Sequence, residues 1–362
     1  MTRRISNAIL ENVSFQAMPA QISAQASIVI VKDIHACQQL WQQFSPQQTI
    51  WDIWETPFSF YDAEQFEPYF LVITETIGNR REVEKEEEAK EKDGNDQNIQ
   101  IKGLLPLWYD KNTKKYLFFG GEYMENIHFW FEPAYFPLIL KHLPRGTFLY
   151  DISQNTVQDI ITQWPDLKEQ FIPSLKHYFL NLSQHAHRID AFLTTYSKKQ
   201  RKTLRQDLNH VERQNLTVTW NNKIMCFDEV AHFNNQRFGQ DSDYSDPVFV
   251  NGLYRLLKHF EKKGLLHTVI VLDTDERDKI GPGGQDNKKV IGVEYAVFYN
   301  KTYYFMVAAY DHSYNNLGKY LTMLHLQRAE TLQAEKVDLL SGEGGWKEQW
   351  KFQEEPYYNF QC

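Results

Sequence analysis

Residues Thr302–Lys347 read TYYFMVAAYDHSYNNLGKYLTMLHLQRAETLQAEKVDLLSGEGGWK, and their pattern indicates the fold class. Thr302–Tyr310 is rich in aromatic and β-branched residues, which is typical of a strand. A helix is predicted next, because apolar residues recur at helical spacing through Leu321, Leu324, His325, Ala329 and Leu332. A short strand, Lys336–Leu340, then leads into a Gly-rich turn. Alternating strands and helices of this kind favour a mixed α/β architecture.

A similar pattern occurs earlier in the chain. Aligning Gly103 with Gly292 sets GLLPLWYDKNTKKYLFFG against GVEYAVFYNKTYYFMVAA, with two extra residues in the first copy's turn. A strand-like run and a polar insertion precede each copy. The insertions are residues 78–100, which are highly charged, and residues 273–289. Shared order and shared insertion position predict a tandem duplication, with chance similarity as the alternative. We expect the charged insertion to be mobile, or else a charged surface helix.

Two helices are predicted in the second half. Ser197–Asn215 has an apolar stripe through Leu204, Leu208 and Val211, and Pro247–Lys263 repeats the helical pattern. We therefore expect two tandem α/β units, each a mixed, mostly antiparallel twisted sheet flanked by helices. The predicted domains are residues 1–190 and residues 191–362.

Composition narrows the class of protein. The 362 residues include 39 basic and 47 acidic side chains, a net charge of −8, which argues against a general nucleic-acid coat. No apolar run approaches the roughly 20 residues of a membrane span, and the N-terminus shows no secretory signal. Three widely spaced cysteines fit a reducing compartment. These features predict a cytoplasmic protein.

Several familiar motifs are missing from the chain. Two Asp-rich runs lack the residues that a calcium loop needs, and His185 and His187 find no third ligand nearby, so no metal site is predicted. Neither a nucleophile elbow nor a P-loop occurs. The turn before Leu321 is different, because main-chain N–H groups at the start of a helix can bind phosphate or pyrophosphate. An ordinary strand-to-helix turn is the alternative.

The second half resembles the acyl-CoA N-acyltransferase (GNAT) superfamily. It is most similar to the two-domain BioF2-like and CelD-type acetyltransferases, which are related to the Fem aminoacyltransferases. The resemblance covers residues 197–352 and rests on three motifs: the basic helix SKKQRKTLRQDLNHVE, the turn Tyr314–Leu321, and Asp338, Gly342 and Lys347 at the spacing D-x-x-x-G-x-x-x-x-K. Over residues 51–150 the resemblance is architectural only, so the first copy is expected to be a degenerate unit that has lost donor binding.

The resemblance implies that an acyl group moves from acyl-CoA, typically acetyl-CoA, to an amine of a small molecule, peptide or sugar, in an acceptor groove between the two units. The predicted pyrophosphate-binding residues are those of the turn and helix start: Tyr314, Asn315, Asn316, Leu317, Gly318 and Lys319. Gly318 is expected to let the backbone approach the phosphates. The turn departs from the family pattern because it has one glycine only.

Acyl transfer needs a base for the amine, a donor for the oxyanion and an acid for the leaving group. Glu294, whose neighbours on a predicted strand point the other way, is a candidate base acting through water; a salt-bridged sheet residue is the alternative. Glu343 is a second candidate. Lys347 matches the family's lysine and is the candidate to stabilise the oxyanion, and Tyr310 to protonate the leaving group.

Two other functions stay open. A Fem-type transferase would take its acyl group from aminoacyl-tRNA, which the basic helix could contact; from Arg188 to Arg213 seven basic residues face three acidic ones. A binding protein that kept the fold but lost catalysis is the second alternative.

Overall fold

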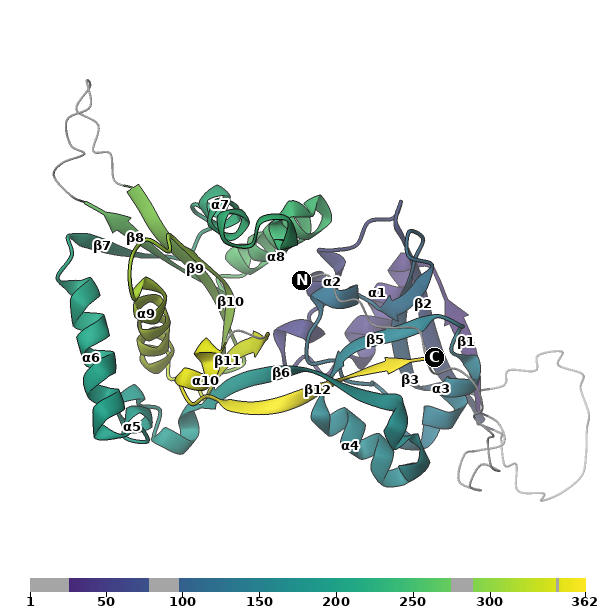
Figure 1. Cartoon of the computed structure of the whole chain (residues 1–362). Coiled ribbons are helices and arrows are strands. Elements are labelled where there is room, and N and C mark those ends of the chain that lie inside the picture. The colour runs from purple at the N-terminus through teal and green to yellow at the C-terminus, as the bar shows by residue number, and fades with distance from the viewer. Residues whose placement is uncertain (1–25, 78–97, 275–288, 343–344) are drawn as a thin grey trace, which may run out of the picture. The chain divides into compact units, whose positions relative to one another are not determined.

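The computed structural model describes residues 26–77, 98–274, 289–342 and 345–362 (Figure 1). Internal contacts divide the chain into two units. The N-terminal unit includes Tyr61–Ser174 and Tyr357–Cys362, and the C-terminal unit includes Gln47–Phe60 and Leu175–Pro356. The predicted boundary after residue 190 stays a prediction. Most of both insertions lies outside the described residues, so the predicted mobility of residues 78–100 stays a prediction too.

The strands of the N-terminal unit follow the order β1-β2-β3-β4-β5-β12. Neighbours are antiparallel except β4 and β5, which are parallel. The strands are β1 (Ala26–Val31), β2 (Phe66–Ile77), β3 (Asn98–Asp110), β4 (Lys115–Phe118), β5 (Thr147–Ile152) and β12 (Gln353–Gln361). Its helices are α1 (Ile34–Phe44), α3 (Phe136–His142) and α4 (Gln154–Gln163).

The C-terminal unit has the order β7-β8-β9-β10-β11-β6, again antiparallel except for one parallel pair, β10 and β11. The strands are β6 (Phe171–Asn181), β7 (Leu216–Asn221), β8 (Leu266–Asp273), β9 (Lys289–Tyr299), β10 (Thr302–Tyr310) and β11 (Lys336–Ser341). The helices are α2 (Glu55–Phe58), α5 (Ile189–Leu193), α6 (Lys198–Glu212), α7 (Phe227–Phe238), α8 (Pro247–Lys262), α9 (Leu317–Thr331) and α10 (Trp346–Gln349).

Helices cover both faces of this sheet (Figure 1). On one face Gly292 of β9 approaches Leu317 and Leu321 of α9. On the other, the ring of Tyr295 contacts Phe227 of α7. The core between the sheet and α9 is fully buried, because strand and helix both direct apolar residues into it: Tyr303, Leu326, Ala329 and Val337 are 0% exposed.

Local sequence explains where the two predicted helices begin. Ser197 caps α6 by accepting from the N–H of Gln200, while the side chain of Gln200 accepts from the N–H of Ser197, which forms a capping box. Asp246 caps α8, with Pro247 at the first helical position. Both helices, predicted from their apolar spacing, are confirmed.

The two units share one topology, which supports the predicted duplication. Gly103 pairs with Ile73 where the register between β2 and β3 shifts, and Gly292 pairs with Val271 where β8 and β9 shift. The glycines that align in the sequence thus lie at equivalent irregularities. The predicted fold class, two tandem α/β units with mixed, mostly antiparallel sheets flanked by helices, is confirmed.

The last strand of each copy pairs in the other unit. β6 closes the first copy in sequence, yet His177–Asn181 pair with β11. β12 closes the second copy, yet Tyr358–Gln361 pair with β5. Among the described residues, no helix is long and apolar enough to span a bilayer.

Candidate functional site

The parallel strands β10 and β11 part shortly after they begin. The two strands pair from Thr302 opposite Lys336 to Tyr304 opposite Asp338. At that point both strands become irregular: β10 has a bulge between Phe305 and Val307, and β11 shifts register against β6 between Asp338 and Ser341. Two bulges at one level turn neighbouring strands away from each other, so main-chain groups of both face an opening in the ladder.

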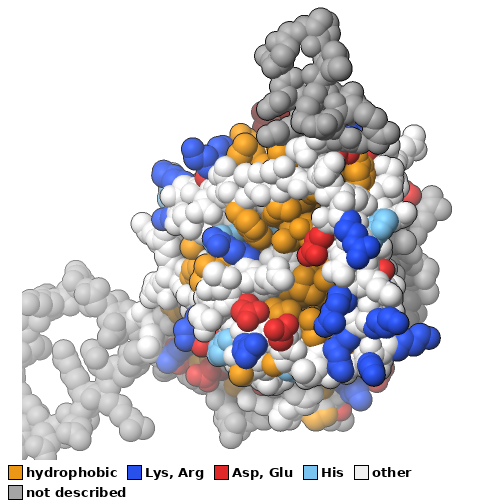
Figure 2. All heavy atoms as spheres, turned by 90° about the vertical axis from the view of Figure 1, so that its left-hand side faces the viewer, with side chains coloured by type: hydrophobic (Ala, Val, Ile, Leu, Met, Phe, Trp, Pro, Cys, Tyr) orange, Lys and Arg blue, Asp and Glu red, His pale blue; other side chains and the backbone are white. Residues whose placement is uncertain are grey.

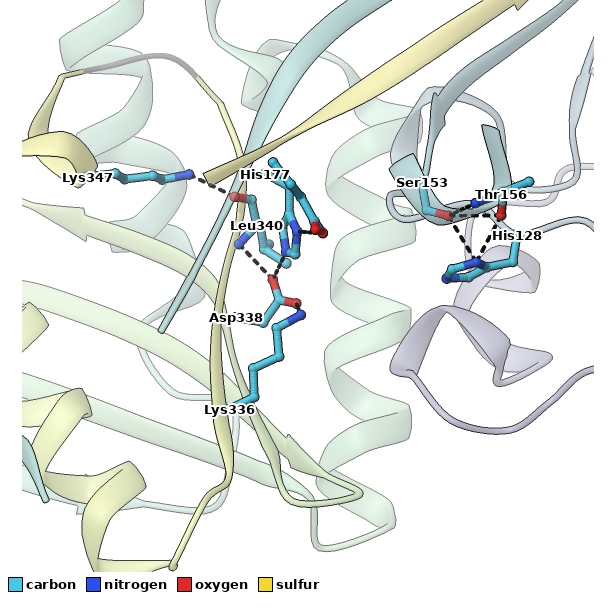
Figure 3. A network of polar contacts seen from close by, with 9 residues as sticks. His128, Ser153, Thr156, His177, Lys336, Asp338, Leu340 and Lys347 are labelled. Atoms are coloured by element: carbon cyan, nitrogen blue, oxygen red, sulfur yellow. Dashed lines mark hydrogen bonds and ion pairs between the residues drawn. The ribbon is translucent and has the colours of Figure 1, made fainter. Parts of the chain in front are cut away.

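Asp338 organises the bulge of β11 (Figure 3). Its Oδ1 lies 2.9 Å from Nε2 of His177 and accepts the N–H of Leu340 at 3.0 Å, and its Oδ2 lies 3.1 Å from Nζ of Lys336. Leu340 has a φ of 59°, a conformation that bulky residues rarely adopt. The hydrogen bond from its own N–H to Asp338 stabilises that conformation locally.

His177 joins three strands. It lies on β6, bonds Asp338 of β11, and its Nδ1 lies 2.9 Å from Oε1 of Glu355 on β12. Burial alone would lower the imidazole pKa, but the charge and hydrogen bond of Asp338, with the hydrogen bond of Glu355, raise it to about 9. Burial would raise the pKa of Asp338, but His177 and Lys336 lower it. At neutral pH the buried pair is therefore charged.

Lys347 reaches back to the same bulge (Figure 3). It is 8% exposed, and its Nζ donates to the carbonyl of Ser341 at 2.7 Å and to that of Leu340 at 3.2 Å. The ring of Tyr178 lies 5.2 Å from the ammonium. Gly342, with a φ of 128°, lies beside Nζ. The residues of the D-x-x-x-G-x-x-x-x-K motif thus form one compact structure at the end of β11. Glu343 lies outside the described residues.

The turn from β10 into α9 is built on Asp311. Its carboxylate accepts from the N–H and the hydroxyl of Ser313 and pairs with Lys289 at 2.8 Å. The hydroxyl of Tyr314 donates to Asp273 at 2.5 Å. Asn316 precedes α9 in a left-handed conformation, with a φ of 67°. The N–H groups of the first helical turn therefore come together at this end of α9, and their predicted role in binding pyrophosphate stays a prediction. Asn315 is exposed there, whereas Leu317 is buried beneath the turn.

The structure shows a packing reason for glycine at position 318, while its predicted role in letting the backbone approach the phosphates stays a prediction. A Cβ at this position would lie 2.5 Å from the hydroxyl of Tyr310, so the missing side chain accommodates the Tyr310 ring. Lys319 pairs with Asp207 of α6 at 2.6 Å. Its ammonium is therefore compensated, and what it offers a ligand is its main-chain N–H.

Glu294 lies apart from the Lys347 structure, two strands away from β11. It is 3% exposed and faces α9, where its Oε2 lies 3.6 Å from Nε2 of His325. Nδ1 of His325 lies 2.6 Å from the Tyr303 hydroxyl. Burial raises the pKa of Glu294 to about 8 and lowers that of His325 to about 3. A carboxyl enclosed in this way gives no support to the predicted base acting through water, and that role stays a prediction.

In the N-terminal unit the corresponding opening is closed by the chain itself. The N–H of Ile127 donates to the carbonyl of Asp151 on β5, and the N–H of Ser153 donates to Ile127. Trp130 forms a bridge with Leu104 of β3. His128 lies beside Ser153 and Thr156, and this hydroxyl cluster caps α4 (Figure 3). Segment 127–131 therefore lies beside both β3 and β5, where the C-terminal unit has the second half of β10, which pairs with β9 but not with the described part of β11 beyond Asp338.

This contrast predicts unequal costs for the two equivalent glycines. In Gly103→Ala the Cβ would lie 2.4 Å from the Trp130 carbonyl and 2.5 Å from the Cβ of Phe131, so we expect the free energy of unfolding to fall by about 3 kcal/mol. In Gly292→Ala the closest atom is Leu321 Cδ1 at 3.2 Å, and a fall of about 1 kcal/mol or less is expected. Urea unfolding of both variants checks this, and equal losses would contradict it.

His177 is not predictable from the sequence. It lies 161 residues from Asp338, in the copy that carries no motif of its own. A lone histidine in a strand has no local signal, and only the exchange of last strands brings it to the motif.

Comparisons with known proteins agree with this geometry. Residues 198–348 match the family model described as an acetyltransferase (GNAT) domain. This region, which is less than half of the chain, is thus similar to the GNAT acyltransferases. No curated protein matches the chain.

The fold is similar to the crystal structure of FemX, with a TM-score of 0.54, 9% identity, and coverage of 90% of this chain and 96% of that one. L-PGS from Bacillus licheniformis has a TM-score of 0.45 at 10% identity, covering 91% and 92%. A tandem GNAT protein from the clavulanic acid biosynthesis pathway has a TM-score of 0.45 at 9% identity, covering 92% and 97%. At 9% identity the similarity to FemX supports the fold alone.

Proposed function

We propose that this protein is an N-acyltransferase that takes its acyl group from acyl-CoA and binds it in the C-terminal unit alone. The family match over residues 198–348 supports the reaction class. The parting of β10 and β11 is the observation that carries the donor assignment. An acyl-pantetheine chain is linear and contains amide groups, so it can hydrogen-bond along a strand edge as an added strand does.

The start of α9 lies at the far end of β10 from that pairing, and it suits the pyrophosphate. The N–H groups of Gly318 and Lys319 have no acceptor within the helix, whereas that of Leu317 donates to the Tyr314 carbonyl, and the helix dipole favours an anion there. The turn holds these groups in place through Asp311 and Tyr314. The ammonium of Lys347 donates two hydrogen bonds to main-chain carbonyls. Lys347 remains the candidate to stabilise the oxyanion at the reacting carbonyl.

The donor assignment predicts one binding site per chain. Segment 127–131 already uses the strand edges of the N-terminal unit, so no equivalent edge is left for a donor there. Calorimetry with acetyl-CoA should therefore give a stoichiometry near one.

A proline separates the main-chain contribution of Lys319 from that of its side chain. Lys319→Pro removes an N–H in the first turn, where proline is tolerated, and should weaken acetyl-CoA binding about 10-fold or more. Lys319→Ala keeps the N–H and loses only the pair with Asp207, so its affinity should stay within about 3-fold. Calorimetry on variants shown to be folded checks the difference. Equal affinity in both would mean that the start of α9 does not hold the donor.

The aminoacyl-tRNA alternative draws support from one surface. α6 exposes five cations near its N-terminal end: Lys198, Lys199, Arg201, Lys202 and Arg205. Figure 2 shows Lys and Arg side chains gathered on the molecular face that includes α6. If the protein binds acetyl-CoA and the affinity falls only slightly as the salt concentration rises, the acyl-CoA donor is favoured. No acetyl-CoA binding, together with tRNA binding that falls steeply with salt, would favour the alternative.

A further inference from the structure

We propose that His177 is a positioning residue of the acyl-transfer site, contributed by the first sequence copy to hold the bulge of β11 and, through it, Lys347. This inference rests on the function proposed above. Its geometric basis is a continuous set of contacts. Glu355 and Asp338 hold the His177 ring from both sides, Asp338 holds the N–H of Leu340, and the carbonyl of Leu340 accepts from Lys347.

The N-terminal unit shows that this bulge forms with other residues at the positions of His177 and Asp338. There β5 shifts register against β12 between Ile152 opposite Tyr358 and Leu149 opposite Phe360. In the C-terminal unit the matching pairs are Ser341 with His177 and Asp338 with Phe179. Tyr358 therefore takes the place of His177, and Leu149 takes the place of Asp338. The left-handed residue is also matched, since Asp151 has a φ of 46° where Leu340 has 59°.

The bulge of the N-terminal unit is held by different contacts, and its left-handed residue, Asp151, is a buried carboxylate that accepts from the Ser174 hydroxyl at 3.0 Å. The N–H of Asp151 donates to Asn359 at 3.2 Å, and the carbonyl of Asp151 accepts from Ile127. In the C-terminal unit the equivalent carbonyl, that of Leu340, accepts from the ammonium of Lys347 instead. The donor to this carbonyl is thus a main-chain N–H in the N-terminal unit and a buried ammonium in the C-terminal unit.

Burying a charged pair costs desolvation free energy, and apolar residues at such positions often give equal or greater stability. His177 and Asp338 are 1% and 3% exposed. Because the same fold is built with Tyr and Leu in the N-terminal unit, the pair is not required to make the bulge. It occurs in the unit whose strands part and whose lysine lies at the parting, which indicates a role in the geometry of that site.

The test compares three variants by acetyl-CoA affinity and by thiol release with an amine found by screening. His177→Gln keeps one hydrogen-bond donor but loses the second ring nitrogen and the charge. We expect kcat to fall about 100-fold, as small misplacements of reacting groups do, while the dissociation constant of acetyl-CoA changes less than about 3-fold. His187→Gln is the control, because His187 is a histidine of the same unit whose Nδ1 contacts only the Ala334 carbonyl, and its kcat should stay near wild type.

The double variant His177→Gln/Asp338→Asn separates positioning from stability, because it replaces a charged pair by a neutral one and leaves no buried ion unpaired. A double variant that melts near wild type but keeps the low kcat supports the inference. A folded double variant with wild-type kcat, or a His177→Gln enzyme as active as His187→Gln, overturns it. If wild-type protein binds no acetyl-CoA, the proposed function itself fails, which is a separate result.

Discussion

Residues 1–190 and 191–362, produced as separate chains, will each fail to unfold cooperatively. Cutting after residue 190 leaves β6 with the first piece and β12 with the second. The sheet of the C-terminal unit then lacks His177–Asn181, which pair with β11, and loses the buried side chains of Tyr178 and Leu180. A strand with buried aromatic and aliphatic residues contributes several kcal/mol, which is about the whole stability of a small domain.

The N-terminal unit loses its last strand in the same way. Tyr357 and Phe360 of β12 are each 1% exposed, and the Phe360 ring contacts Phe136 and Phe171. Circular dichroism melts of each piece, alone and mixed, measure the effect. We expect a broad or absent transition for either piece alone and recovery of a sharp transition when both are refolded together.

A cut between Ile77 and Asn98 is the matched control, because it also divides the chain in two but leaves every described strand in its sheet. β2 and β3 stay paired across that cut, and the co-produced fragments should melt within a few degrees of the intact chain. A piece 191–362 that melts alone like the intact protein would contradict the exchange of last strands.

Much of the fold can be predicted from local pattern. The apolar spacing of Leu204, Leu208 and Val211 predicts α6, and the alignment of Gly103 with Gly292 pairs two residues that lie at equivalent bulges. Helical periodicity is seen in the spacing of neighbouring residues, and a duplication is seen when two segments are aligned. Both can therefore be identified from the sequence alone. The exchange of β6 and β12 cannot be predicted from local pattern. A last strand with the same alternation of apolar and polar residues could pair in its own unit or in the other one.

The candidate site is less accessible to sequence for the same reason. The motif residues Asp338 and Lys347 can be identified through the family resemblance, but their partners cannot. His177 comes from another copy, and the role of Gly318 depends on the Tyr310 ring, which packs against it from the preceding strand. Glu294 is a reasonable candidate by its strand position, yet its surroundings are set by α9, which sequence spacing does not place.

Asp338→Asn should lower the free energy of unfolding by about 3 kcal/mol near pH 6, because it leaves the buried His177 without its main partner. The effect should depend on pH in a defined direction. The folded pKa of His177 is raised from 6.5 to about 9, so its contribution to stability is complete below pH 6.5 and is lost as the pH rises through 9. The difference between wild type and variant should therefore shrink between about pH 7 and 10.

The dependence of stability on pH in the acid range is set by the carboxylate of Asp338. Its folded pKa is lowered from 3.8, so its contribution is present above pH 3.8 and is lost as the pH falls below that value. The other charged groups facing the pair, Glu355 and Lys336, remain in the variant, so what is measured is the Asp338–His177 interaction. Urea unfolding from pH 3 to pH 10 should give a difference that is largest near pH 6. Glu354→Gln, which breaks the exposed Lys176–Glu354 pair, should leave the free energy of unfolding close to that of wild type. A flat difference for Asp338→Asn across this range would mean that the two buried residues do not form an ion pair in the folded protein.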